Sequence, residues 1–439
     1  MKTINRLESE VRSYCRSFPV QFASAEGARL TTTDGVDYLD FLAGAGTMNY
    51  GHNHPELKAA LLDYVSNDQV VHGLDMATEA KEQFLEVFER HVLLPRQLDY
   101  KVQFTGPTGT NAVEAALKIA RRVTGRSNVI SFTNGFHGVS MGSLAVTANS
   151  FYRERAGLPM AGTDFMPYDG YLGDGIDTTE FLNRMLCDGS SGIDHPAAVV
   201  VETVQGEGGV NVASMDWLEN LQQVCRQHDV LLIVDDIQMG CGRTGSFFSF
   251  SDADVQPDIV TLSKSLSGYG LPMSLVLLKP ELDDWRPGEH NGTFRGNNLA
   301  FVTARRALEV FWQDSNFADR IQERGALLEG RLQDFLDNGA AESVSLRGRC
   351  MVQGLDFGTG ERASAVTKKA FERGVIIETS GSDGQVVKFL TPLTISETEL
   401  LRGIETVTDA AAEVLDEESA TEQKRFAKLV HEEPLLAVS

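Results

Sequence analysis

A lysine stands where an apolar run stops in the second half of the chain. Residues 258–272 read "DIVTLSKSLSGYGLP", so Lys264 comes directly after the β-like run from Ile259 to Leu262. Most lysines are solvated surface charges, and Lys264 taken alone is compatible with that role. The alternative is an amine held in a pocket at the carboxyl end of a strand, where open α/β sheets bind ligands.

Two adjacent carboxylates follow another apolar run. The stretch "LLIVDDIQMGCGRTG" places Asp235 and Asp236 after four apolar residues. A buried carboxylate is costly unless it has a cation or several hydrogen-bond donors as partners. A protonated pyridine nitrogen is one such partner, and the carboxylate would in turn keep that nitrogen protonated. Binding of Mg²⁺ and capping of the next turn are equal alternatives for this motif.

A helix start supplies a third kind of group. In "GPTGTNAVEAALKIARR", apolar residues recur at spacings of three and four, which predicts a helix from about Asn111 to Gly125. Gly109 and Thr110 precede it, and their free N–H groups would lie at the positive end of the helix dipole. This is either a phosphate-binding turn or an ordinary helix cap.

Two further strand ends carry candidate residues. "VISFTNGFHGVS" sets Phe136 and His137 between glycines, which favours presentation of an aromatic ring to a flat ligand or burial of that ring in the core. "VVVETVQGEGG" places Glu202, Gln205 and Glu207 at the same edge of the expected sheet.

The elements that must position these residues alternate along the chain. Strand-like and helix-like segments alternate from about residue 55 to 280, which predicts an α/β fold with a mostly parallel sheet covered by helices on both faces. Asp34-Gly35 predicts a hairpin near the N-terminus. After about residue 305, a long helical stretch leads into strands and amphipathic helices that end near Glu418. We expect an N-terminal segment (1–50) that joins a C-terminal α+β unit (306–439), and a large unit (51–305) between them.

Composition excludes several classes of function. With 39 basic and 62 acidic residues, the chain carries a formal charge of −23, so nucleic acid and anionic membranes are poor partners. The five cysteines form no C-x-x-C pair, which favours reduced thiols without zinc or disulfides. His52 and His54 lack ligand-spaced partners, so no metal site is expected. With no apolar segment of about 18 residues, a cytoplasmic, unanchored protein is expected.

The four features are more specific together than singly. Pyridoxal phosphate needs an amine for a Schiff base, an anion beside its ring nitrogen, N–H groups for its phosphate and a flat contact for its ring. Lys264 could supply the amine and Asp235 the anion. The turn before the helix could supply the N–H groups, and Phe136 the flat contact. The constellation therefore predicts a pyridoxal phosphate site, with Lys264 as covalent anchor and proton shuttle.

The motifs also resemble a known family. "VDDIQMGCGRTG", "SKSLSGYGLP" and "HNGTFRGNNLA" resemble the class III aminotransferases of the fold-type I pyridoxal phosphate superfamily, over nearly the whole chain. "DFLAGAGTMNYGHNHPELK" and "SFTNGFHGVSMG" resemble the members that move an amino group from glutamate to the terminal aldehyde of an amino acid. The resemblance implies small amino acid and aldehyde substrates. An aminotransferase for other ω-amines, an aminomutase or racemase, and a non-catalytic member are the alternatives.

The resemblance also assigns roles to residues. It implies the Schiff-base lysine at Lys264, the partner of the ring nitrogen at Asp235 and a contact with the ring O3′ at Gln238. It further implies cofactor contacts at Gly109, Thr110 and Phe136. We expect His137 and Glu202, which lie at expected strand ends, to contact the cofactor as well. Thr293 matches a threonine that reaches the phosphate of the neighbouring subunit, which implies a homodimer with shared sites, possibly within a higher oligomer.

Substrate contacts follow the family less closely. Glu207 matches a carboxylate that engages an arginine in ω-aminotransferases and swings aside for glutamate. Lys388 stands in the place of an arginine that pairs with a substrate α-carboxylate, and lysine is a point charge without the bidentate fork. Val139 stands where some relatives carry another arginine. Lys388 and Arg295 are therefore the candidate cations for the substrate carboxylates.

Overall fold

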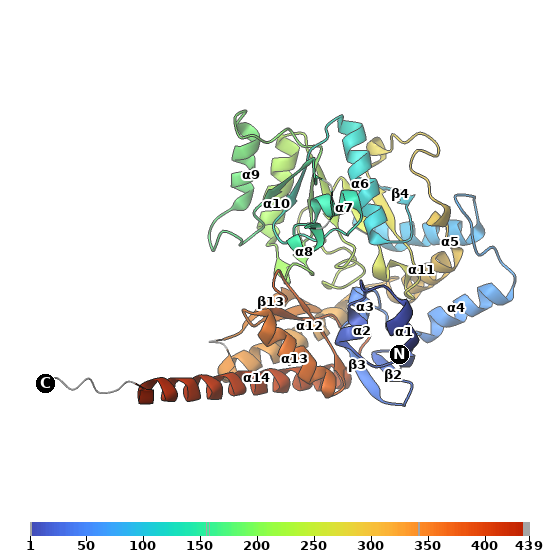
Figure 1. Ribbon diagram of the computed structural model, residues 1–439. Coiled ribbons are helices and arrows are strands. Elements are labelled where there is room, and N and C mark those ends of the chain that lie inside the picture. The colour runs from blue at the N-terminus through green and yellow to red at the C-terminus, as the bar shows by residue number, and fades with distance from the viewer. Residues whose placement is uncertain (1, 155, 158, 341–342, 433–439) are drawn as a thin grey trace.

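A mostly parallel sheet forms the body of the molecule (Figure 1). The computed structural model describes residues 2–154, 156–157, 159–340 and 343–432, with side chains as far as residue 420. In spatial order, the strands of this sheet are β4 (Lys101–Phe104), β12 (Leu275–Leu278), β11 (Ile259–Leu262), β10 (Leu231–Asp235), β7 (Ala198–Val201), β5 (Val129–Phe132) and β6 (Thr163–Met166). Only β12 runs antiparallel to its neighbours in this described sheet, so the predicted sheet type is confirmed.

Apolar residues cover both faces of this sheet, as the continuous apolar runs predict. In β10, Ile233 packs into a cluster with α6 (Gly109–Thr124), while Leu232 and Val234 pack into the large cluster on the other face. The structure begins α6 at Gly109 rather than at Asn111, and Gly125 ends it. Further helices flank the sheet: α4 (Pro55–Ser66), α5 (Glu79–Phe88), α9 (Thr178–Cys187), α10 (Met215–Gln227) and α11 (Asn298–Phe311).

The N-terminal segment pairs with a distant part of the chain. β2 (Arg29–Thr32) and β3 (Asp37–Asp40) form the predicted hairpin, with Gly35 at φ +83° in its turn. β1 (Phe22–Glu26) extends this sheet on one side, and β15 (Val375–Ile376) pairs in parallel with β3 on the other. The parallel pairing of β15 with β3 joins the first 50 residues to the C-terminal third.

The C-terminal third contributes an antiparallel sheet in the order β13 (Ser345–Arg349), β14 (Val352–Asp356), β17 (Val386–Phe389) and β16 (Glu378–Ser380). Helices α12 (Asn316–Phe335), α13 (Gly360–Glu372) and α14 (Glu397–Glu432) accompany it. The expectation that the last helix ends near Glu418 was wrong, because α14 continues to Glu432. Residues 419–432 are rich in alanine, glutamate, lysine and glutamine, which are good helix formers.

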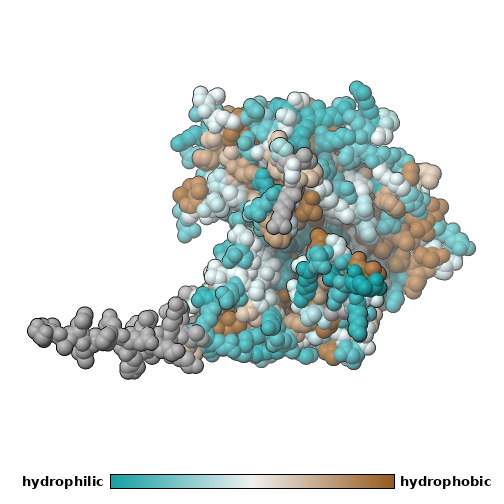
Figure 2. Space-filling view, in the orientation of Figure 1, coloured by the Kyte–Doolittle hydropathy of each residue, from teal (hydrophilic) through white to brown (hydrophobic). Residues whose placement is uncertain are grey.

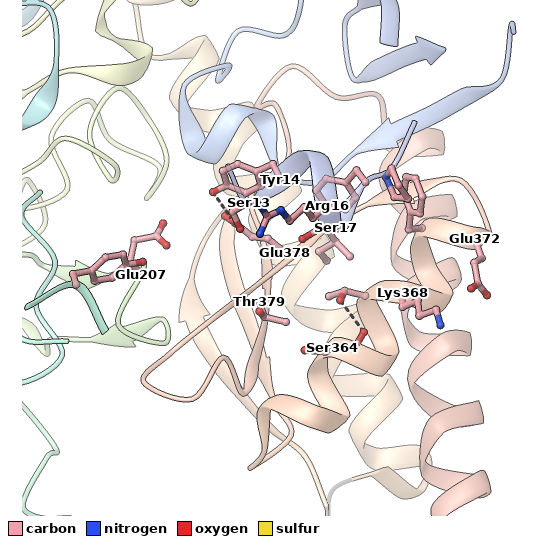
Figure 3. Close-up of a pocket in the computed structure, with 16 residues that line it drawn as sticks. Ser13, Tyr14, Arg16, Ser17, Glu207, Ser364, Lys368, Glu372, Glu378 and Thr379 are labelled. Carbon is pink, nitrogen blue, oxygen red and sulfur yellow. Dashed lines mark hydrogen bonds between the residues drawn. The ribbon is translucent and has the colours of Figure 1, made fainter. Parts of the chain in front are cut away.

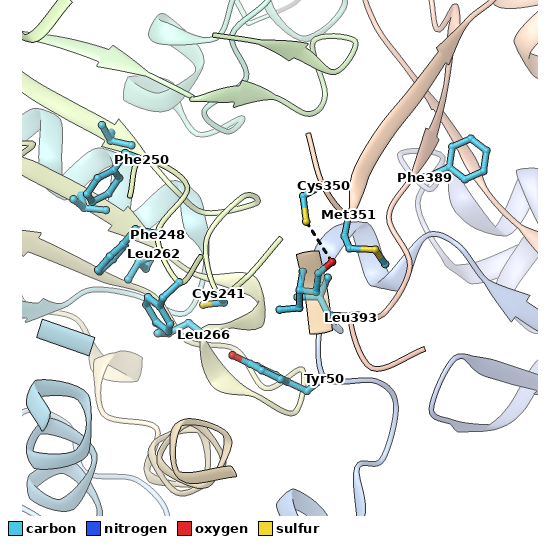
Figure 4. Close-up of a cluster of buried hydrophobic side chains, with 14 of the residues drawn as sticks. Tyr50, Cys241, Phe248, Phe250, Leu262, Leu266, Cys350, Met351, Phe389 and Leu393 are labelled. Atoms are coloured by element: carbon cyan, nitrogen blue, oxygen red, sulfur yellow. Dashed lines mark hydrogen bonds between the residues drawn. The ribbon is translucent and has the colours of Figure 1, made fainter. Parts of the chain in front are cut away.

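One hydrophobic cluster joins the central sheet to the C-terminal third (Figure 4). It unites Cys241 and Phe248, which follow β10, with Met351 and Leu393 from the C-terminal third. None of the helices in the described part of the chain is long and apolar enough to cross a membrane. The shared core holds the C-terminal sheet against the carboxyl-end edge of the central sheet.

Candidate active site

Residues that follow four parallel strands converge with the start of α6 around a cavity of about 350 Å³. Carboxyl ends of parallel strands meet at one edge of a sheet, and there the strand ends bring their polar residues together. The lining includes the following predicted residues: Gly109, Thr110, Phe136, His137, Glu202, Glu207, Asp235, Gln238 and Lys264. Within the described part of the chain, Thr293, Arg295 and Lys388 lie outside this lining.

Asp235 is the most constrained carboxylate of the cavity. Its Oδ2 lies 2.7 Å from Nδ1 of His137, and its Oδ1 accepts a hydrogen bond of 2.9 Å from Thr261. Burial would lower the pKa of His137, but the hydrogen bond and charge of Asp235 raise it overall. The adjacent Asp236 points elsewhere and accepts hydrogen bonds from Ser249. Of the two carboxylates, Asp235 is therefore the one available to a ligand.

Glu202 contributes a second buried carboxyl group. Its Oε1 accepts a hydrogen bond of 2.9 Å from the backbone N–H of Phe136, which fixes the turn that carries the aromatic ring. Burial raises the pKa of Glu202 to about 7, although the charge of His137 opposes the shift. Glu202 thus positions Phe136 at the cavity wall.

Lys264 points its amine at the backbone of a distant segment. It has φ +50°, and its Nζ donates a hydrogen bond of 2.8 Å to the carbonyl oxygen of Ala45. Burial lowers the pKa of Lys264, against the opposing charge of Glu207. A lowered pKa favours the neutral amine, which is the nucleophilic form.

The carbonyl that Lys264 meets was not found by sequence reasoning. Residues 43–46 all have positive φ, between +48° and +84°. Ala45 O accepts from Lys264 and also from Nε2 of Gln238, at 3.0 Å. Two non-glycine residues in left-handed conformation are the kind of strain that marks functional sites. The small residues of "AGAG" were the available signal.

The start of α6 has the form of an anion site. Thr108 caps the helix, and the Thr110 hydroxyl lies 2.6 Å from that of Ser140 and 2.8 Å from that of Ser143. Glycine at 138 allows this approach, because a Cβ there would lie 2.6 Å from Thr110 Oγ1. The helix N-terminus, Gly109 and Thr110 therefore meet the cavity without a bulky side chain between them.

Gln238 links the cavity to a buried ion pair. Its Nε2 donates to Glu207 Oε1 at 2.9 Å, whereas its buried Oε1 finds no hydrogen-bond partner among the described residues. Glu207 Oε1 also accepts from Nζ of Lys388 at 2.7 Å. Burial would raise the pKa of Glu207, but the charges of Lys388 and Lys264 lower it to about 2. The glutamine thus offers an unsatisfied acceptor to a ligand hydroxyl.

The two candidate cations differ in their surroundings. Lys388 is fully buried and ion-paired with Glu207 and with Glu378, so it adjoins the cavity behind Glu207. Arg295 lies in the short turn Thr293–Arg295 and donates to Asn291, outside the cavity of its own chain. Glu378 was missed by sequence reasoning, although a charged residue within the apolar "VIIETS" was a usable signal.

The chain was compared with known proteins. The family model for "Aminotransferase class-III" matches residues 12–411. The diaminobutyrate–2-oxoglutarate transaminase of Bordetella parapertussis is 58% identical over 96% of this chain and 98% of its own length. That of Halomonas elongata is 56% identical over 92% of this chain and 96% of its own.

Solved structures agree with the fold. The ornithine aminotransferase from Toxoplasma gondii, which holds PLP at partial occupancy in its active site, superposes with a TM-score of 0.81, 28% identity and 95% coverage of both chains. An S-selective transaminase from Bacillus megaterium superposes with a TM-score of 0.83 over 94% of this chain and 97% of its own, at 23% identity. The predicted fold class is confirmed. The cavity with its lysine and carboxylate thus lies in a chain that belongs to the class-III aminotransferase family.

Proposed function

We propose that this chain is a pyridoxal phosphate-dependent aminotransferase that carries the amino group of L-glutamate to L-aspartate 4-semialdehyde. The products would be L-2,4-diaminobutyrate and 2-oxoglutarate. The supporting observation is that the buried amine of Lys264 shares one cavity with the Asp235–His137 pair, in a chain 58% identical to a diaminobutyrate–2-oxoglutarate transaminase. The acidic composition and the free cysteines support a cytoplasmic location.

The cavity fits the cofactor by the chemistry of its lining. Lys264 would hold the cofactor aldehyde, Asp235 would face the ring nitrogen, and the N-terminus of α6 with Thr110 would receive the phosphate. The unsatisfied Oε1 of Gln238 would accept a hydrogen bond from the ring hydroxyl. When bound, pyridoxal phosphate supplies an electron sink for the charge left on the substrate carbon after deprotonation.

The residues of this chain supply the proton transfers and a contact for a substrate carboxylate. The neutral amine of Lys264 can take a proton from the reacting carbon and return it to a neighbouring atom. Asp235, held by His137 and Thr261, keeps a positive charge favourable at the ring nitrogen. If Glu207 turns aside, Lys388 becomes free to bind a substrate carboxylate.

The proposed reaction is tested by a substrate panel. Purified enzyme with L-glutamate and L-aspartate 4-semialdehyde should produce L-2,4-diaminobutyrate, measured by chromatography of the amino acids. In reverse, diaminobutyrate should exceed ornithine in kcat/KM by about 10- to 200-fold, because one extra methylene in a pocket costs that much. A higher kcat/KM for ornithine, 4-aminobutyrate or acetylornithine would reject the proposed substrate, and amino-group migration without a 2-oxo acid would indicate an aminomutase.

We propose further that the enzyme is a homodimer in which Thr293 serves the site of the partner subunit. Thr293 and Phe294 lie at the surface, and Phe294 is among the exposed large apolar residues. Figure 2 shows apolar residues gathering on the side of the molecule that carries α4 and α5, where Leu62 and Val65 of α4 are exposed. An apolar surface of this kind fits an interface between copies of the chain.

Mixed dimers test the sharing of Thr293. Thr293→Ala should weaken cofactor binding by about 10- to 100-fold, because a hydrogen bond to a charged group is lost. When Thr293→Ala and Lys264→Ala subunits are unfolded and refolded together, about one quarter of all sites should regain both residues, provided that the sites are shared. The mixed preparation, assayed at limiting cofactor, should therefore be well above either single variant in activity. No recovery would place Thr293 in its own subunit's site or outside any site.

A further inference from the structure

A second cavity of about 760 Å³ opens on the far side of Glu207. Figure 3 shows Glu207 reaching toward it from the side of the central sheet, opposite Tyr14 and Glu378. Its walls come from the N-terminal segment, α13 and β16. Glu207 lines both cavities, so a substrate whose reacting end meets Lys264 would extend past Glu207 toward Glu378.

Strand register fixes Glu378 beside Lys388. The two residues are directly opposite in the antiparallel pair of β16 and β17. Glu378 Oε1 lies 3.1 Å from Lys388 Nζ, whose shorter contact, at 2.7 Å, goes to Glu207. Exposed fractions of the side chains are 0% for Lys388, 9% for Glu378 and 24% for Glu207. Lys388 is therefore shared between two carboxylates.

The hydrogen bonds of the two carboxylates are unequal. Glu207 Oε1 accepts from both Gln238 and Lys388. Glu378 Oε2 accepts a hydrogen bond of 3.0 Å from the hydroxyl of Tyr14, but its buried Oε1 receives no aligned hydrogen bond from any described residue. Its ion pair with Lys388, at 3.1 Å, is therefore the contact that holds this oxygen, and a donor that reaches it would add a second partner.

Two carboxylates compete for the ammonium group of Lys388. Glu207 and Glu378 both contact that ammonium group, and Tyr14 and Tyr152 carry neutral hydroxyls. The wider wall of the cavity adds the cations Arg16 and Lys368 and the carboxylate Glu372. His137 is paired with Asp235 on the far side of the first cavity. The shorter contact of Lys388 goes to Glu207, so Glu378 is the less closely paired of the two carboxylates, and a substrate cation could pair with it.

We infer that Glu378 is a specificity-determining residue that receives the α-ammonium group of the substrate that reacts at its terminal carbon. This inference rests on the proposed function, in which diaminobutyrate and aspartate semialdehyde react at the end remote from their α-carbon. Glutamate reacts at its own α-amino group, so its remote end is a carboxylate and gains nothing from Glu378. Glu378 therefore favours the half-reaction with diaminobutyrate and is neutral or unfavourable for the half-reaction with glutamate.

Half-reaction kinetics of the holoenzyme test this assignment. The cofactor absorbance change is followed with L-2,4-diaminobutyrate, with 4-aminobutyrate, which lacks the α-ammonium group, and with L-glutamate. In Glu378→Gln, the second-order rate constant for diaminobutyrate should fall by about 10- to 100-fold, because a charged hydrogen bond is lost. The constants for 4-aminobutyrate and glutamate should stay near wild type or rise. Glu372→Gln, an exposed carboxylate on the wall of the same cavity, should leave all three unchanged.

The outcomes separate the two proposals. Equal losses with all three amines, or unchanged selectivity in Glu378→Gln, would overturn the role of Glu378 alone. A wild-type enzyme that reacts with glutamate but not with diaminobutyrate would overturn the proposed function and this assignment with it. Tyr14→Phe provides a second variant: removal of its hydrogen bond to Glu378 should reduce the diaminobutyrate rate selectively, and a loss shared by glutamate would contradict the assignment.

Discussion

Replacement of Lys264 with alanine should lower turnover by at least about 10⁴-fold, because the variant loses both the covalent anchor and the group that moves the proton. The visible absorbance of the lysine-linked cofactor should disappear at the same time. Steady-state assays and absorption spectra of the purified protein measure the two effects. A Lys264→Ala enzyme with wild-type activity would contradict the assignment of Lys264.

The stability of the apoenzyme supplies the control for Lys264→Ala. The amine makes one described hydrogen bond, to Ala45 O, and burial lowers its pKa below that of the unfolded chain. Between the pKa of the unfolded chain and the lowered pKa of the folded state, the unfolded state binds the proton more readily, so stability falls as pH falls through this window. Below the lowered pKa the folded state carries the buried charge and the full cost remains. Alanine removes this cost, and the melting temperature of the apo variant should equal or exceed that of the wild type near neutral pH. Lys279→Ala, which breaks a partly exposed ion pair with Asp258, should leave the cofactor spectrum unchanged.

Replacement of Asp235 with asparagine should lower kcat/KM by roughly 10- to 1,000-fold. A neighbouring opposite charge shifts a pKa by about one to three units, and each unit corresponds to about 1.36 kcal/mol between protonation states. The neutral amide loses this influence on the ring nitrogen and on His137, whose pKa should fall in the variant. Kinetics and NMR titration of His137 measure the two consequences.

The neighbouring carboxylate is a matched control for Asp235. Asp236 is fully buried, bonded to Ser249 and outside the cavity lining, and burial raises its pKa to about 7. Asp236→Asn should therefore change the free energy of unfolding, measured by denaturant titration, while kcat/KM and the cofactor spectrum stay close to wild type. If Asp236→Asn impairs catalysis as strongly as Asp235→Asn, the ring-nitrogen role of Asp235 is wrong.

The sequence by itself determined which residues end at the ligand-binding edge of the sheet. Lys264 and Asp235 each follow an apolar run, and Gly109 and Thr110 adjoin the start of a helix whose apolar spacing is evident. In a parallel sheet, local pattern is enough to bring such residues to one edge, because the carboxyl ends of neighbouring strands coincide. The motifs of the resemblance then favoured pyridoxal phosphate over Mg²⁺ binding at Asp235.

Tertiary structure decided the contacts that depend on register and on distant segments. Glu378 stands opposite Lys388 only because β16 pairs with β17 in one register, and a shift by one residue would turn Glu378 to the other face. Ala45 meets Lys264 only because the N-terminal segment packs against the central sheet, and His137 meets Asp235 across two strand ends. Such contacts join residues tens to hundreds of positions apart, so no local pattern encodes them. They arise from the packing of the whole chain, which is why the sequence indicated the cofactor but only the folded structure revealed the surroundings of Glu378.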